Sequence, residues 1–81
     1  MLNEMQNILF RKTVRTDFHG KSTYYCATGE TNGYAVFRIG PSTEDESLIE
    51  RQLVRFFMDY EKDMAIEFCL DTANREKESL K

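Results

Sequence analysis

Hydrophobic and polar residues alternate in the first half of the chain, which is the pattern of half-buried β-strands. Three segments have this character or are rich in β-branched and aromatic residues, at residues 9–18, 22–28 and 34–39. In the first of them, Phe10, Val14 and Phe18 share one side of an extended chain. Turn residues separate the segments, and Asn32-Gly33 is a strong hairpin signal. These patterns predict a three-stranded antiparallel meander.

The hydrophobic period changes after residue 41. Apolar side chains now recur at intervals of three and four, at Ile49, Leu53, Phe56, Phe57 and Tyr60. This spacing predicts a long amphipathic helix over residues 44–60 that packs its apolar side on the sheet. Thr43 and Glu46 have the spacing of a capping box, and Glu44 and Asp45 would place negative charge at the positive end of the helix dipole.

A bend is expected between Tyr60 and Asp63, because an unbroken helix would put Glu67 in the middle of the buried side. Residues 64–79 then fit a second helix capped by Asp63, and their Ala, Glu, Lys and Arg content favours it. The alternation of Met64, Ile66, Phe68 and Leu70 fits a strand equally well, so a strand remains the alternative.

The predicted fold class is therefore α+β, a single small domain over residues 1–81. It consists of a three-stranded antiparallel β-meander, a long amphipathic helix on one face and a helical C-terminal segment. Residues 2–7 form a short helical turn or a tail. A chain of 81 residues with 41% hydrophobic and 31% charged residues fits one globular domain with a thin margin of stability.

The composition also bears on location. No apolar stretch approaches the ~20 residues that a membrane span needs. The first residues lack the basic and apolar regions of a secretory signal peptide. Two cysteines are too few for the disulfide framework of a small secreted domain. We expect a cytoplasmic protein that does not enter a membrane.

No motif for catalysis, a metal ion or a cofactor is found in the sequence. His19 is the only histidine and lies in a predicted turn, which is a poor place for a reactive pair with Cys26. Cys26 and Cys69 are expected to be small buried hydrophobic residues. One histidine and two separated cysteines do not complete a zinc site, and the glycines match no phosphate-binding loop. We expect a protein that is not an enzyme and needs no cofactor.

A second apolar stripe is the most informative feature of the predicted helix over residues 44–60. Val54 and Met58 would lie away from Ile49, beside Arg51 and Arg55. Apolar residues rimmed by arginines are typical of recognition surfaces, although the C-terminal segment could equally cover this stripe. The candidate partner-binding residues are Glu50, Arg51, Val54, Arg55, Met58 and Glu61.

Three functions follow for a small acidic chain of net charge -3 and pI near 5.1. The favoured one is a protein-binding module, such as an adaptor or an inhibitor of a larger host protein of the kind that phages and mobile elements use, anti-CRISPR proteins included. The second is a nucleic-acid-binding regulator that uses Arg11, Lys12 and Arg15, which the acidic total disfavours. The third is a self-assembling structural protein, with Val54 and Met58 in a homodimer contact.

The order of the predicted elements, with three strands followed by a helix, resembles the outline of the double-stranded-RNA-binding domain. That family has a lysine-rich start to its last helix. The same place here reads Ser42-Thr43-Glu44-Asp45-Glu46, whose charge would repel phosphate. The resemblance implies a similar order of elements and no RNA binding.

Overall fold

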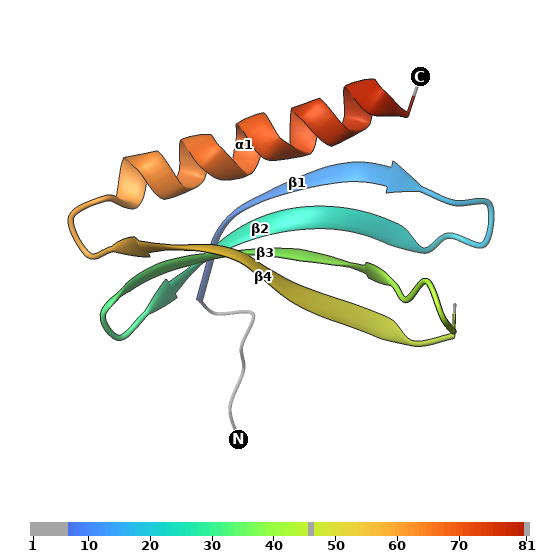
Figure 1. Cartoon of the computed structure of the whole chain (residues 1–81), viewed down its shortest axis with the longest axis horizontal. Helices are drawn as coiled ribbons and strands as arrows, with labels where there is room; N and C mark the ends of the chain where they lie inside the picture. The colour runs from blue at the N-terminus through green and yellow to red at the C-terminus, as the bar shows by residue number, and fades with distance from the viewer. Residues whose placement is uncertain (1–6, 46, 81) are drawn as a thin grey trace.

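The computed structural model describes residues 7–45 and 47–80, which form a four-stranded antiparallel sheet with one helix across one of its faces (Figure 1). The elements are β1 (Ile8–Thr16), β2 (Ser22–Glu30), β3 (Gly33–Pro41), β4 (Ile49–Met58) and α1 (Lys62–Ser79). The strands lie in the order β1-β2-β3-β4, so each strand pairs with its neighbours in the sequence. The α+β class is confirmed, but with four strands and one helix where the sequence predicted three strands and two helices.

The three predicted strands are present with shifted ends. Phe18, predicted to lie on the buried side of the first strand, lies beyond β1 in the turn and is 94% exposed. The loop between β2 and β3 consists of Thr31 and Asn32, and Gly33 pairs with Glu30 as the first residue of β3. A Cβ on Gly33 would clash with the backbone of β4, so this glycine permits the close approach of the two strands.

The predicted helix over residues 44–60 is wrong, because most of this segment forms β4 at the edge of the sheet. Within β4, Leu53 and Arg55 pair with consecutive residues of β3, which leaves Val54 between them as an extra residue. Such an insertion is a β-bulge, which bends the strand and changes which face the following side chains occupy.

The bulge explains why the sequence pattern resembled a helix. The β3 partners of Ile49, Leu53 and Phe56 are Pro41, Phe37 and Ala35, which all lie on one face of the sheet. The three β4 residues therefore share that face, although their spacing along the chain is four and three. A helical spacing thus arises from a strand with one inserted residue. Phe56 and Tyr60, predicted to pack against the sheet, are 45% and 79% exposed.

Residues 42–45, 47 and 48 lie in the loop between β3 and β4. The Asp45 carboxylate accepts hydrogen bonds from the backbone N–H of Ser47 at 3.0 Å and from its hydroxyl at 2.6 Å, which stabilises the turn. The described residues that directly follow Thr43 are not helical, so the predicted capping box is not formed. Glu46, its other member, lies outside the described residues, and so does the prediction for residues 2–7 except at Asn7.

Helix α1 confirms the helical interpretation of the C-terminal segment and begins two residues earlier than predicted. Glu61 occupies the position before the helix, and its carboxylate accepts the Met58 N–H at 2.8 Å. Asp63, predicted to be the cap, lies in the first turn, where its charge suits the helix dipole. No helix in the described part of the chain is long and apolar enough to cross a membrane.

The hydrophobic core lies between α1 and the sheet. The helix contributes small side chains, Ala65, Cys69 and Ala73, each at most 1% exposed, which let its backbone approach the strands closely. The sheet contributes Val14, Tyr25, Ala27, Val36 and Phe57. The helix packs chiefly against β1 and least against β4. The contact between the helix and the sheet is therefore least extensive at β4, the strand with the most exposed apolar residues.

Candidate protein-binding surface

Figure 1 shows that α1 covers one face of the sheet and leaves the opposite face without a helix. The side chains on that opposite face are those that alternate with the core residues along the strands. We call it the open face. Cross-strand pairing places Arg11, Cys26, Phe37 and Leu53 on one line across the four strands. Apart from Arg11 on the edge strand β1, this line is apolar. The open face therefore resembles the surface of a second core layer more than the polar exterior of a small domain.

β4 gives the open face its most exposed side chains. The apolar residues of this strand on the open face are Ile49 at 63%, Leu53 at 56%, Phe56 at 45% and Met58 at 51% exposure. Together these residues expose roughly 400 Å², backbone included, which is similar to the ~300–600 Å² of the largest apolar patch on a typical monomer. The largest apolar patch of a monomer is often functional.

A hollow of about 150 Å³ lies beside these side chains on the open face. It is lined by Ile8, Tyr24, Cys26, Thr28, Phe37, Ile39 and Arg51. A space of ~150 Å³ lined by apolar groups admits a molecule of the size of benzene. The hollow is therefore large enough to receive one apolar side chain from a partner, which is how the central residues of many interfaces bind.

Two arginines have their guanidinium groups over aromatic rings of the open face. The guanidinium carbon of Arg11 is 4.0 Å from the centre of the Tyr24 ring, and that of Arg51 is 4.7 Å from the Phe37 ring. Such contacts contribute about 0.5–1 kcal/mol each at exposed sites. They hold the aliphatic parts of the arginines against the sheet, which extends the apolar surface and leaves positive charge near its edges.

The structure separates the predicted partner-binding residues. Arg51 and Met58 lie on the open face, and Val54 at the bulge is 39% exposed. The second apolar stripe is therefore not covered by the C-terminal helix. Glu50 pairs with Gly40 and faces the α1 side, and Glu61 is engaged with the β4 backbone as described above.

Arg55 also lies on the α1 side. Its guanidinium carbon is 4.7 Å from the centre of the Phe57 ring and 5.5 Å from that of Phe68, and those two rings are 5.5 Å apart. Arg55 thus covers one end of the core. Sequence reasoning missed Ile49, Leu53 and Phe56 as surface residues, because it assigned them to the buried side of a helix.

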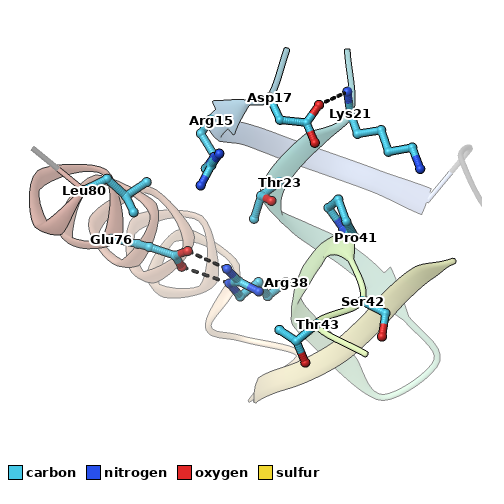
Figure 2. A pocket seen from close by; sticks show the side chains of 10 residues that line it. All are labelled: Arg15, Asp17, Lys21, Thr23, Arg38, Pro41, Ser42, Thr43, Glu76 and Leu80. Carbon is cyan, nitrogen blue, oxygen red and sulfur yellow. Dashed lines mark hydrogen bonds and ion pairs between the residues drawn. The ribbon is translucent and has the colours of Figure 1, made fainter. Parts of the chain in front are cut away.

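A second hollow, of about 280 Å³, lies between the C-terminal end of α1 and the ends of the strands (Figure 2). Figure 2 shows Glu76 of α1 facing Arg38 of β3. The Glu76 carboxylate accepts hydrogen bonds from Arg38 Nε at 2.9 Å and Nη2 at 2.5 Å, and from the Tyr25 hydroxyl at 2.7 Å. The network joins the helix to two strands.

These contacts change the ionisation of the network. Hydrogen bonds from Arg38 lower the pKa of Glu76. Burial, together with the bond to Glu76, raises the pKa of Tyr25 to about 12. Glu76 is therefore charged and Tyr25 neutral at physiological pH, and their polar groups satisfy one another. We interpret the network as structural.

The basic residues of β1 do not form one patch. Arg11 lies on the open face, Lys12 pairs with the core residue Tyr25 and so faces α1, and Arg15 lines the hollow of Figure 2. Arg11 is therefore separated from Lys12 and Arg15, which lie on the α1 side of the sheet.

The residues that the sequence analysis considered for catalysis lie apart in the structure. His19 is exposed in the β1–β2 turn, where its ring contacts that of Phe18, while Cys26 is buried in the middle of β2. Burial raises the pKa of the Cys26 thiol and raises that of Cys69 to about 12, and both cysteines are free. Within residues 7–45 and 47–80, no three His, Cys, Asp or Glu side chains are grouped to hold a metal ion.

Comparison of the chain with protein-family models, with curated proteins and with solved structures gave no match. The chain is an α+β protein in which a helix covers one face of the sheet and exposed apolar residues lie on the other face.

Proposed function

We propose that the protein is a non-enzymatic protein-binding module that binds its partner through the open face of the sheet. The observation that carries this proposal is the row of exposed apolar side chains on β4. Removing apolar surface from water contributes ~25 cal/mol per Å², so burial of this row contributes at most ~10 kcal/mol. Association and the ordering of side chains consume much of this, and the remainder suits a specific complex.

The arrangement of the open face supports the same proposal. A hollow that admits one apolar side chain lies on the open face, with Arg51 of β4 in its lining, and Arg11 lies on the opposite edge strand. Apolar side chains with arginines among them are typical of protein interfaces. A chain of this size that binds but does not catalyse suits an adaptor, or an inhibitor that occupies a surface of a larger protein.

The test compares two matched variants in affinity capture from the source cell. Leu53→Asp places a charge in the centre of the exposed row, and Leu80→Asp makes the same change at the end of α1, where the leucine is 49% exposed. We expect proteins retained by the wild type and by Leu80→Asp to be lost with Leu53→Asp, because a buried unpaired charge strongly weakens an interface. Equal retention by the three proteins would contradict the proposal.

A second candidate function is binding of single-stranded nucleic acid. It is favoured by Tyr24 and Phe37, each with an arginine over its ring, since aromatic side chains on a sheet can stack on bases. It is disfavoured by the acidic total charge and by the aliphatic side chains that dominate β4. Fluorescence anisotropy with a labelled oligothymidylate decides between the two: binding that weakens steeply with salt favours this candidate, and no binding at low salt ends it.

A further inference from the structure

We propose that the partner of the open face is a second copy of this chain, in a two-fold dimer whose two sheets pack face to face with α1 of each copy on the outside. This inference rests on the proposed function, because it names the occupant of the same surface. Two sheets packed in this way lie ~10 Å apart and form a shared core from their inner faces.

The area of the open face is the first reason. A stable interface of standard size buries ~800 Å² on each partner. The four exposed apolar residues of β4 supply roughly half of this area, and the partly exposed residues around the hollow add to it. The open face therefore offers a large part of the area that a dimer interface of standard size buries on each copy.

The shape of the open face is the second reason. A two-fold dimer joins one patch to itself, so the patch must be self-complementary. The open face carries exposed side chains such as Leu53 and Phe56 beside a hollow of about 150 Å³ lined by Tyr24 and Phe37. A projecting side chain of one copy can enter the hollow of the other, and the two-fold axis repeats that contact.

Analytical ultracentrifugation of the purified full chain from about 1 µM to 1 mM tests the inference. We expect the wild type to approach twice its mass of 9.5 kDa. Leu53→Asp and Leu53→Lys should each raise the dimer dissociation constant by ~100-fold or more, because a charge of either sign would be buried. Leu80→Asp, the matched control, should leave the constant within about threefold.

A second pair guards against loss of fold in the Leu53 variants. Met58 on the open face and Met64 on α1 are both 51% exposed. Met58→Asp should weaken the dimer, and Met64→Asp should not. Circular dichroism of each variant checks that the secondary structure is retained.

Each other outcome overturns the inference. A dimer that persists in the folded Leu53 and Met58 variants would place the contact elsewhere. A wild-type monomer up to 1 mM would exclude a second copy as the occupant, yet the proposed function would stand if affinity capture still depended on Leu53. A monomer that dimerises after removal of residues 1–6 would identify the chain's own N-terminal segment as the cover. A monomer whose capture is also insensitive to Leu53 would refute both proposals.

Discussion

Replacing Glu76 by glutamine removes the charge that joins α1 to the sheet. Glu76 accepts three hydrogen bonds, two from Arg38 and one from the Tyr25 hydroxyl, at 2.5–2.9 Å. The side chain of Glu76 is 22% exposed and that of Arg38 is 36% exposed. Glutamine keeps the shape and one acceptor oxygen but gives up the charge and the paired contact with the guanidinium group.

The expected loss lies between two limits. Hydrogen bonds to charged groups contribute about 1.5–3 kcal/mol each when shielded from water. Exposed ion pairs contribute ~1 kcal/mol or less. For this half-exposed network, Glu76→Gln should lower the free energy of unfolding by about 2 kcal/mol. In a domain of 60–100 residues such a loss lowers Tm by roughly 10 °C.

The pH dependence provides a separate signature. The pKa of Glu76 in the folded protein is lowered from the ordinary value of 4.5, chiefly by Arg38. Its contribution is therefore complete above pH 4.5 and is lost as the pH falls through the lowered folded value. Tyr25 acts at the other end, because its pKa is raised from 10.0 to about 12 in the folded protein. Its contribution is complete below pH 10 and is lost as the pH rises toward 12.

Urea denaturation followed by circular dichroism at pH 7 and pH 3.5 measures the stability lost in Glu76→Gln and the contribution of the Glu76 charge to acid sensitivity. Glu67→Gln is the matched control, since Glu67 is an exposed residue of the same helix. The wild type should lose more stability than Glu76→Gln between the two pH values. A loss below about 0.5 kcal/mol at pH 7, or identical acid sensitivity of the wild type and Glu76→Gln, would refute a structural role for the network.

Three further predictions concern the bulge, the thiols and the core. Deleting Val54 removes the inserted residue and keeps both halves of β4 in register, so the chain should still fold with a cost of ~1 kcal/mol; an unfolded circular dichroism spectrum would contradict it. Cys26 and Cys69 should react with a thiol reagent at pH 8 only after unfolding, because burial raises the pKa of both thiols; fast labelling of the native protein would count against their burial. Phe57→Ala should cost ~3–5 kcal/mol, since Phe57 is 3% exposed and packs on Phe68; a Tm shift of only a few degrees would show that the site is not core.

The sequence carried enough information to predict the strands of the first half and the C-terminal helix. In β1, Phe10 and Val14 alternate with polar residues, and both lie on the α1 side in the core or against it. Residues 62–79 combine good helix formers with small residues at helical spacing. These signals are local, so they can be recognised in the sequence without knowledge of the tertiary structure.

The direction in which each strand faces was not available from local pattern. In β3, both alternating sets of side chains contain apolar residues, with Val36 on the α1 side and Phe37 on the open face. Only the position of α1 decides which set is core. The candidate residues were predicted to lie on a helix, whereas Arg51 and Met58 lie on β4 and face the open side of the sheet.

The bulge at Val54 explains both why a helix was predicted over residues 44–60 and why its apolar side was predicted to be buried. Read as a helix, Ile49, Leu53 and Phe56 form one buried side; in a strand with one inserted residue, they form one exposed side. A single helix of 18 residues can cover one face of a four-stranded sheet, and the other face then needs a cover from elsewhere if its apolar side chains are to leave water. The residues that made the helix interpretation attractive are therefore the ones that lead us to expect a second chain on the open face.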